Sequence, residues 1–430
     1  MFRTLKSPLN VQIEVTEKCD NCCRHCYNFF RHNDYKCKTM SFANIDKIVY
    51  ELDLLQVPKT TITGGEPLVA LEKSLYLAKK LQGCGIGAHL NSNLTNFGEE
   101  TGIKFKEVGV SSIMTSLIAD DPAVHDWVTQ RPGSWLKTTN GIKLAQKLGF
   151  RVIVNMVLTK WNFHRLQQTG DLVGTWGIDK FGATRACSPS PIASDFFPNV
   201  ISTDELRESL KILYELKDKW GYKVDVLEHY PWCALQDIDK YRYLARRKCL
   251  AGVAGATIGT DGQLRPCGHS AMTYGNVFQE GLQKPWLKMK DWRRQIYSKE
   301  CWDCVYFKLC TGGCPVEAQN SPNKKDHHCS NIKDIVFTPE KKFSLGLSFK
   351  TVFQFSSAVM LRKEEFGGVI VSSNSGAILV DKKTFDILDI LIKQKSFTIA
   401  DILDMFQTDD KSTERFISKL VKHKLVNARR

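Results

Sequence analysis

The sequence predicts an α/β protein in three parts, and three observations support this division. Its first half alternates short apolar runs with amphipathic helical patterns, which is typical of a parallel sheet covered by helices. Regularly spaced cysteines follow, and beyond them the composition changes to a hairpin and several helices. We therefore expect a partial (β/α)6 TIM barrel at residues 1–220, a cysteine-rich domain at 221–340 and a small winged-helix-like α+β domain at 341–430.

The composition is that of an ordinary globular chain of 430 residues, with 43% hydrophobic and 25% charged residues. Residues 1–10 contain no apolar segment typical of a signal peptide, and no run of about 18 apolar residues could span a membrane. We therefore expect a cytoplasmic protein without a membrane partner. In that reducing compartment, 15 cysteines indicate metal or redox chemistry rather than disulfides.

The formal net charge of +14 suggests an anionic partner, but the basic residues are spread along the whole chain. A solvated basic surface explains this distribution better than a nucleic-acid site does. We therefore do not expect a nucleic-acid partner.

Six apolar runs in the first part have the length of buried strands, and helical patterns lie between them. Parallel α/β sheets bind ligands at the C-terminal ends of their strands, so the residues that follow each run are the first candidates for a site. The expected strands are residues 11–15, 60–63, 87–91, 110–116, 152–158 and 180–184, and the expected helices are residues 42–55, 71–81, 137–147 and 163–172.

The first candidate site follows the first strand, where Cys19, Cys23 and Cys26 stand at C-x3-C-x2-C spacing. Three thiolates on one short loop can hold three irons of a four-iron cube and leave the fourth iron open to another molecule. A structural zinc site is the alternative, but it needs four closed ligands, and His25 would have to be the last one. Cys22 lies outside this spacing, and we expect it to be a non-ligand.

The loop after the second strand contains Gly64, Gly65 and Glu66 in the order Thr-Gly-Gly-Glu-Pro. Two glycines allow a sharp turn and a close approach of the backbone to a ligand. The Glu66 carboxylate and the backbone carbonyls can accept hydrogen bonds from an ammonium group.

Together, these two motifs resemble those of the radical S-adenosylmethionine (SAM) enzymes. The resemblance implies that the three cysteines hold a [4Fe–4S] cluster whose open iron binds the amino and carboxylate groups of SAM. It also implies that Gly64, Gly65 and Glu66 hold the SAM amino group, and that an electron from the cluster splits SAM to give a 5′-deoxyadenosyl radical. Such an enzyme needs an electron donor such as flavodoxin or ferredoxin.

The resemblance extends to the loops after the third and fourth strands. Asn93 is expected near the SAM ribose, in a loop similar to the Thr-Asn-Gly-Thr element of the family, although Leu94 stands where the family has glycine. Ser116, at the end of the fourth strand, matches a serine of the family. Arg131 and Arg185 are placed to meet a carboxylate of SAM or of the substrate, and a structural salt bridge is the alternative for each.

The cysteines in the middle of the chain follow the spacing C-x12-G-x4-C, then C-x2-C-x5-C-x3-C, then a final C. This spacing resembles, residue for residue, the SPASM domain, which binds two auxiliary [4Fe–4S] clusters. Two zinc ribbons are the alternative, but seven ligands do not divide into two closed four-ligand sites. The resemblance assigns Cys249, Cys267 and Cys314 to the first auxiliary cluster, and Cys301, Cys304, Cys310 and Cys329 to the second.

The first auxiliary set is one ligand short, since residues 250–266 contain no cysteine. Either Cys233 completes it, or its open iron binds a substrate thiolate, as is expected of a thioether-forming maturase. Sulfatase-maturing relatives carry an acidic residue just after the second cysteine of this set, where the present chain has Gly268 and His269. Serine oxidation is therefore not expected.

The last part of the chain predicts a hairpin whose turn contains Asn374 and Gly376, followed by three helices. In order and length it resembles the PqqD-like peptide-recognition module of ribosomal peptide maturases, which binds a leader peptide as an added strand. A structural cap and a DNA-binding winged helix are the alternatives. The expected strands are residues 366–371 and 377–380, and the expected helices are residues 383–393, 399–406 and 413–422.

These features predict a radical SAM/SPASM enzyme that abstracts hydrogen from a ribosomal precursor peptide and forms a thioether or C–C crosslink. The leader of that peptide would be its partner. A small molecule or cofactor precursor is the alternative substrate, and an iron–sulfur regulator that binds DNA is an alternative of another class. The double-glycine motif argues against a regulator, which has no need of SAM.

Overall fold

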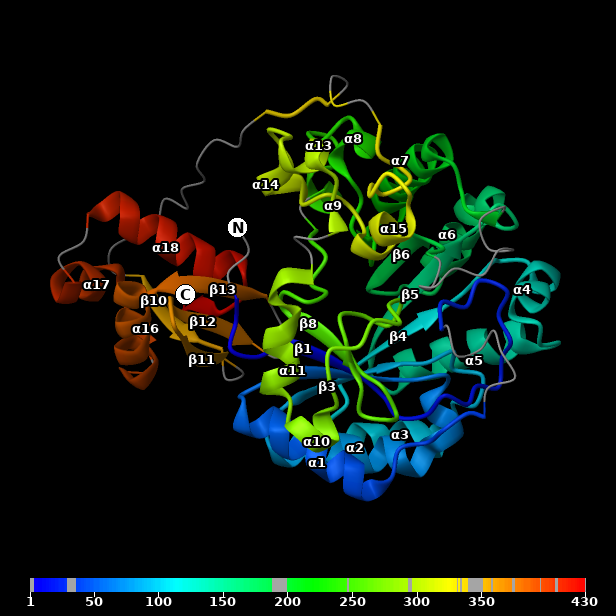
Figure 1. The fold of residues 1–430 in the computed structure, drawn as a ribbon, viewed down its shortest axis with the longest axis horizontal. Helices are drawn as coiled ribbons and strands as arrows, with labels where there is room; N and C mark the ends of the chain where they lie inside the picture. The colour runs from blue at the N-terminus through cyan, green and yellow to red at the C-terminus, as the bar shows by residue number, and fades with distance from the viewer. Residues whose placement is uncertain are drawn as a thin grey trace. The chain divides into compact units, whose positions relative to one another are not determined.

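The computed structural model shows two compact units, residues 1–337 and residues 338–430 (Figure 1). The residues that the structure describes are 4–28, 36–187, 199–245, 247–292, 296–330, 332, 335–338, 351–356, 359–372, 376–394, 396–406 and 409–429.

The first unit is built on one sheet of nine strands in the order β7-β6-β5-β4-β3-β2-β1-β8-β9. Strands β1 to β7 run parallel, and helices connect them, as the alternation in the sequence predicts. The expected partial (β/α)6 barrel is therefore confirmed, and a seventh parallel strand extends it. The parallel strands are β1 (Asn10–Glu14), β2 (Lys59–Thr63), β3 (Gly87–Asn91), β4 (Ser112–Ser116), β5 (Arg151–Leu158), β6 (Lys180–Arg185) and β7 (Lys223–Asp225).

Some helices of this unit begin at side chains that accept hydrogen bonds from their free backbone amides. Ser41 accepts a hydrogen bond from the Asn44 amide at the start of α1, and Ser202 forms a reciprocal capping pair with Glu205 at the start of α7. Helices α1, α2 and α3 lie in a row along one side of the strands (Figure 1). The helices are α1 (Phe42–Leu54), η2 (Pro67–Ala70), α2 (Leu71–Gly83), α3 (Glu99–Glu107), α4 (Pro122–Thr129), α5 (Ser134–Lys147), η3 (Phe163–Arg165), α6 (Leu166–Gly174) and α7 (Thr203–Trp220).

A row of apolar side chains in register crosses the parallel sheet and forms part of its core. Ile13, Ile62, Leu90, Ile113 and Val152 are direct neighbours from β1 to β5, and each is at most 1% exposed. Burying a side chain of this size contributes about 1.5–3 kcal/mol. The row fixes the register of five strands, so the loops that follow them meet at the same edge of the sheet.

The cysteine-rich segment joins this same sheet, which the sequence pattern did not predict. Strand β8 (Gly255–Ile258) pairs in parallel with β1, and β9 (Leu264–Arg265) pairs antiparallel with β8. Arg265 also forms a buried ion pair with Glu14 of β1. The short helices of the segment are α8 (Trp232–Leu235), α9 (Arg242–Ala245), α10 (Val277–Glu280), α11 (Gln283–Lys288), η5 (Met289–Asp291), α13 (Lys299–Trp302), α14 (Phe307–Cys310) and α15 (Pro315–Asn320).

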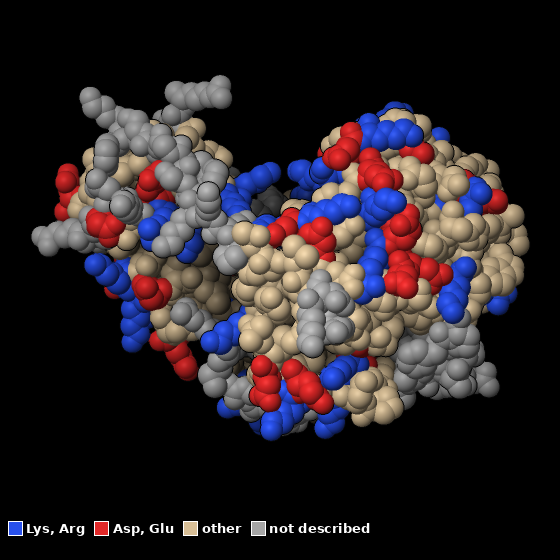
Figure 2. Space-filling model, turned by 90° about the horizontal axis from the view of Figure 1, so that it is seen from above, with Lys and Arg blue, Asp and Glu red and all other residues tan. Residues whose placement is uncertain are grey.

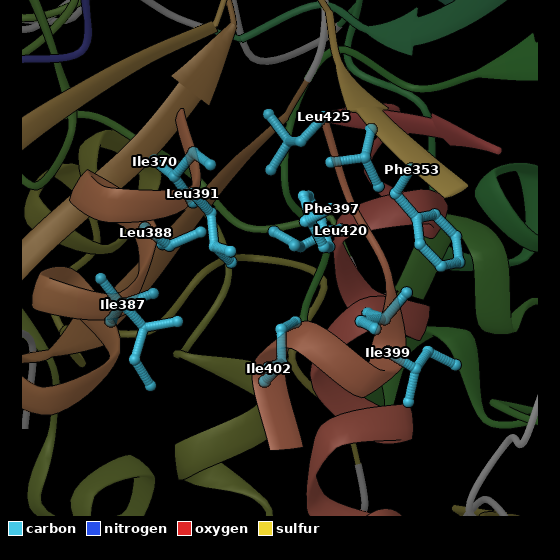
Figure 3. Packing of buried hydrophobic residues seen from close by; sticks show 13 residues of the cluster. Phe353, Ile370, Ile387, Leu388, Leu391, Phe397, Ile399, Ile402, Leu420 and Leu425 are labelled. Atoms are coloured by element: carbon cyan, nitrogen blue, oxygen red, sulfur yellow. The ribbon is translucent and has the colours of Figure 1, made fainter. Parts of the chain in front are cut away.

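The second unit has its own apolar core between two three-stranded antiparallel sheets and three helices (Figure 3). Ile370, Leu388 and Leu391 are fully buried there, and the rings of Phe353 and Phe397 stack at 5.7 Å. The expected turn residue Asn374 lies outside the described residues. The elements are β10 (Val352–Phe355), β11 (Val359–Glu364), β12 (Gly367–Ser372), β13 (Ala377–Asp381), α16 (Lys382–Gln394), β14 (Ser396–Phe397), α17 (Ile399–Phe406), α18 (Asp410–Lys422) and β15 (Val426–Arg429).

This second unit contains the expected hairpin, since β12 and β13 are antiparallel, and the three expected helices follow it. Strand β11 extends the hairpin to a three-stranded sheet in the order β11-β12-β13. The other sheet, β14-β10-β15, was not expected from the sequence, because its strands have only two to four residues.

Basic and acidic side chains are interspersed on the face drawn in Figure 2. Ion pairs join some charged side chains of the first unit, such as Lys80 with Asp46 at 2.9 Å and Lys219 with Asp171 at 2.7 Å. No helix in the described part of the chain is both long and apolar enough to cross a membrane.

Candidate functional site

A cavity with about 260 Å3 of water-accessible space lies where the loops after the parallel strands meet. Its position at the C-terminal ends of the strands agrees with the rule for parallel α/β sheets. Most of the residues singled out from the sequence line it: Cys19, Cys23 and Cys26 after β1; Gly64, Gly65 and Glu66 after β2; Asn93 after β3; and Ser116 at the end of β4.

The two glycines after β2 allow this loop to lie directly against the cysteine loop. The amide of Gly65 donates to the carbonyl of Thr16 at 2.6 Å, and the amide of Glu66 donates to the carbonyl of Lys18 at 2.8 Å. A Cβ atom on Gly64 would lie 2.3 Å from the Thr16 carbonyl oxygen, and one on Gly65 would lie 2.3 Å from that of Lys18. The glycines are therefore required for contact between the two loops.

Glu66 is buried, at 1% exposure, and its carboxylate joins the loop after β2 to the loop after β3. It accepts hydrogen bonds from the Leu68 amide at 2.9 Å, the Ser92 hydroxyl at 2.7 Å and the Asn93 amide at 2.8 Å. Burial raises the pKa of Glu66 to about 7, although these hydrogen bonds favour the charged form. The carboxylate thus orients the two loops around the cavity.

Asp20 joins the cysteine loop to the loop after β3, and sequence reasoning missed this residue. Its carboxylate accepts from the side chains of Asn93 at 2.7 Å and Asn96 at 2.9 Å, and also from the Thr95 hydroxyl. Leu94 adopts a left-handed backbone, with φ of 60°, although it carries a large side chain that is fully buried. The backbone conformation that glycine adopts readily is therefore present here with leucine.

Arg131 is not among the described residues that line the cavity. Its guanidinium instead donates to the backbone carbonyl of Asp20. In this structure Arg131 therefore holds the cysteine loop in place, and the expectation that it meets a carboxylate of SAM or of the substrate stays a prediction.

Two histidines line the cavity with ring nitrogens that lack a hydrogen-bond partner within the described chain. They are His25, through Nδ1, and His125, through Nε2. Burial lowers the pKa of each to about 4, so both are neutral near pH 7. A buried polar atom without a partner carries an energetic penalty that a bound ligand would relieve. These two nitrogens therefore indicate that the cavity binds a polar ligand.

The wall of the cavity at the end of β6 contains a buried charged network. Arg185 forms two hydrogen bonds with the Asp326 carboxylate, at 2.8 and 2.7 Å, and a third with Glu228 at 3.2 Å. The Glu228 carboxylate also lies 2.7 Å from the Cys187 sulfur, and the Tyr230 hydroxyl donates to it at 3.0 Å. Arg185 therefore forms a structural salt bridge, which was the alternative interpretation of this residue.

The cysteines of the second half fall into two neighbourhoods. In the first, burial raises the pKa of Cys267 to about 12, and the adjacent thiols of Cys249 and Cys314 add to this effect. In the second, the Cys329 thiol is hydrogen-bonded with those of Cys233 and Cys301. The residues around this second neighbourhood include Cys233, Cys301, Cys304, Cys310 and Cys329.

Cys233 is thus corrected from a candidate member of the first set to a neighbour of the second. The reason is that α8, which carries Cys233, packs beside the chain around Cys329: the Ser330 amide donates to the Cys233 sulfur at 3.4 Å. Within the described ranges, no three His, Cys, Asp or Glu side chains converge as ligands of a single metal ion. A lone zinc ion holds its sulfur ligands about 2.3 Å from one point. In a four-iron cube each thiolate binds a different iron, so the thiolates need not converge on one point.

Sequence reasoning did not find Asp20, Cys187, Glu228 or Asp326. Cys187 had a usable signal, because it follows an expected strand by three residues and therefore lies at the ligand-binding edge of the sheet. Glu228 and Asp326 had none, since their roles depend on contacts with residues more than 40 positions away.

Comparison with known proteins agrees with this geometry. Residues 13–173 match the model of the Radical SAM superfamily. An AdoMet-dependent heme synthase of Methanosarcina barkeri is 22% identical over 73% of this chain and 93% of its own length. The antilisterial bacteriocin subtilosin biosynthesis protein AlbA of Bacillus subtilis is 26% identical over 76% of this chain and 70% of its own length.

A solved structure has the same fold. Streptococcus suis SuiB bound to S-adenosylmethionine superposes with a TM-score of 0.61 at 19% identity, covering 76% of this chain and 78% of SuiB. SuiB has also been solved bound to the precursor peptide SuiA, with a TM-score of 0.62 to this chain.

Proposed function

Residues 13–173 match the model of the Radical SAM superfamily, and from this match we propose that the chain is an iron–sulfur enzyme that modifies a ribosomally made precursor peptide. The observation that carries the proposal is the meeting of two loops in one cavity. Cys19, Cys23 and Cys26 line it from one loop, and Gly64, Gly65 and Glu66 line it from the next. The donor set fits a cluster with one open iron, because three thiols share a single short loop.

In this proposal Cys19, Cys23 and Cys26 would hold a [4Fe–4S] cluster, and the backbone of Gly64 and Gly65 would receive the SAM amino group. When bound, the cluster and SAM would supply the radical chemistry that removes a hydrogen atom from a carbon of the substrate. Asn93 and Ser116 lie on the side of the cavity where the ribose is expected. His25 and His125 contribute neutral ring nitrogens for polar atoms of SAM or of the peptide.

The chain's own charged residues act by holding the loops before the reaction begins. Glu66 joins the loops after β2 and β3, Asp20 joins the cysteine loop to the loop after β3, and Arg131 fixes the Asp20 backbone. Binding groups held in place in advance lose less entropy when a ligand arrives. Glu66, Asp20 and Arg131 are positioning residues in this account.

The two cysteine neighbourhoods support two auxiliary [4Fe–4S] clusters. One would be held by Cys249, Cys267 and Cys314, and the other by Cys301, Cys304, Cys310 and Cys329. Closing one thioether or C–C bond removes two hydrogens from the peptide. The radical would take one of them as a hydrogen atom, the second would leave as a proton to solvent, and the auxiliary clusters would accept its electron.

A peptide substrate is supported by two of the compared proteins. AlbA is named for the biosynthesis of a bacteriocin, and SuiB has been solved with a precursor peptide. In this proposal the second unit would act as a PqqD-like recognition module, and the outer strands β11 and β13 of its three-stranded sheet support that role. An outer strand has backbone groups that a leader peptide can pair with as an added strand.

A small-molecule substrate is the second candidate, because the compared heme synthase is matched over 93% of its length. Incubation of the full chain, anaerobically reconstituted with iron and sulfide, with SAM and dithionite distinguishes the two candidates. With a precursor peptide we expect methionine, 5′-deoxyadenosine and a peptide lighter by two hydrogens. Zinc in place of iron and sulfide, or no methionine, would contradict the proposal. Turnover of a tetrapyrrole but of no peptide would favour the second candidate.

A further inference from the structure

The first auxiliary set of the proposed function has three cysteines, and the structure brings a fourth to it from a distant part of the chain. Cys187, two residues beyond the end of β6, is 5% exposed, and its thiol is hydrogen-bonded with the thiol of Cys314. Cys314 belongs to a buried apolar cluster against which Cys249 and Cys267 also pack. Cys187 and the three cysteines of the set therefore lie in one neighbourhood, although the sequence motif contains only three.

The fold holds Cys187 and Cys314 together through a separate set of contacts. Arg185, two residues before Cys187, binds the Asp326 carboxylate with two hydrogen bonds. The same carboxylate accepts a hydrogen bond from the backbone amide of Cys314 at 2.8 Å. The end of β6 and the start of α15 are thus fixed to a common carboxylate, which sets the position of both thiols.

The other candidate for the fourth position is elsewhere. Cys233 is hydrogen-bonded with Cys329, and it lines a pocket with the four cysteines of the second set. That neighbourhood already has its four thiols without Cys233. Cys233 therefore lies with the second set, whereas Cys187 contacts Cys314 of the first set.

The sulfur of Cys187 is also held in place by the charged network at the end of β6. Its sulfur lies 2.7 Å from the Glu228 carboxylate, and the buried guanidinium of Arg185 lies beside the same carboxylate. Coordination by Cys187 would release one proton from the thiol, as metal binding by cysteine does in general.

We propose that Cys187 is the fourth protein ligand of the auxiliary cluster held by Cys249, Cys267 and Cys314. This inference rests on the proposed function, and it deepens it in one respect. A cluster with four cysteine ligands has no open iron for a substrate thiolate. The auxiliary cluster beside the cavity would then transfer electrons without binding the peptide.

The test uses the full chain with Cys19, Cys23 and Cys26 changed to Ala, so that only the auxiliary clusters contribute to the signal. Cys187→Ala and Cys187→Ser are made in this background. Cys84→Ala is the matched control, because Cys84 is an exposed cysteine on α2's C-terminal cap. After anaerobic reconstitution, iron and sulfide per chain are measured, together with the EPR spectrum of the dithionite-reduced protein.

The parent should contain about eight irons per chain, and its EPR spectrum should not change when a small thiol is added. Cys187→Ala should either fall to about four irons or keep its iron and acquire a spectrum that the added thiol shifts. Cys187→Ser should keep the iron with altered g values, and Cys84→Ala should match the parent. Identical iron content, spectrum and thiol response in all variants would overturn the inference and leave the proposed function standing.

Two further outcomes are decisive. A parent without two [4Fe–4S] clusters would contradict the proposed function itself. A Cys187→Ala variant in the wild-type background with an unchanged auxiliary spectrum but an altered product would instead make Cys187 a hydrogen donor to the substrate, and would overturn its role as a ligand.

Discussion

The guanidinium of Arg185 and the carboxylate of Asp326 are joined by two hydrogen bonds, and neither side chain is exposed to solvent. The two residues are 141 positions apart in the chain. This pair connects the last strand of the six-fold repeat with the segment that carries Cys329. It therefore couples the cavity wall to both cysteine neighbourhoods.

Breaking this pair from one side should be strongly destabilising, because the remaining charge has no access to water. Asp326→Asn or Arg185→Met should lower the free energy of unfolding by about 3–5 kcal/mol. Replacing both residues with apolar ones should recover a large part of this loss. Anaerobic denaturant unfolding of the reconstituted protein measures the effect.

The exposed ion pair of Glu100 and Lys104 on α3 is the matched control for that experiment. Exposed pairs contribute little because water screens them. Glu100→Gln should leave the unfolding midpoint unchanged, and an equal loss in both variants would contradict a special role for the buried pair.

The buried carboxyl of Glu66 predicts a pH dependence of stability. Burial raises its pKa to about 7 from its ordinary value of 4.5, so between these two values the folded state holds a proton that the unfolded state has lost. The stabilising contribution of protonated Glu66 to the free energy of unfolding is therefore fully present below pH 4.5 and is lost as the pH rises through 7. Between pH 5 and 8 the wild type should lose stability relative to Glu66→Gln, measured by denaturant unfolding in the absence of SAM. Parallel pH profiles of the two proteins would contradict the assignment.

Gly65→Ala should separate the two loops of the cavity, since its Cβ would lie 2.3 Å from the Lys18 carbonyl oxygen. We expect loss of the Gly65–Thr16 hydrogen bond and at least a tenfold loss in SAM cleavage. Gly83→Ala is the control, because nothing lies within 4 Å of the added Cβ and alanine is the better helix former. Methionine release, measured anaerobically with dithionite, should be unchanged in the control.

Truncation after residue 337 tests the role of the second unit. The core around Phe353 and Leu388 lies entirely within residues 338–430, so its removal leaves the core of the first unit intact. SAM cleavage without peptide should be retained, while the affinity for the leader of the precursor peptide should fall by tenfold or more. Isothermal titration with the leader alone measures the affinity, and an unchanged value would leave the unit with a structural role. Retardation of DNA by the full chain but not by the truncated one would support the regulator.

Much of the fold could be predicted from the sequence because its signals are local. Apolar runs separated by helical patterns indicated each of the six first strands, and the spacing of Cys19, Cys23 and Cys26 placed their loop after β1. The Gly-Gly-Glu loop could be assigned to the same edge of the sheet, because parallel strands end on one side. Hydrophobic periodicity and short cysteine spacings extend over only a few residues, so they can be recognised in the sequence alone.

The tertiary structure alone decided which distant groups meet. Strand β8 lies beside β1, where Ile258 is paired with Ile13, 245 positions earlier in the chain. The backbone of β8 pairs with the side of β1 that faces away from β2. Arg185 is paired with Asp326, Cys233 neighbours Cys329, and Cys187 reaches Cys314 for the same reason: packing of the cysteine-rich segment on the strand ends sets these contacts. Burial then determines their chemistry, since a charge or thiol removed from water interacts strongly only with the groups that the fold places beside it.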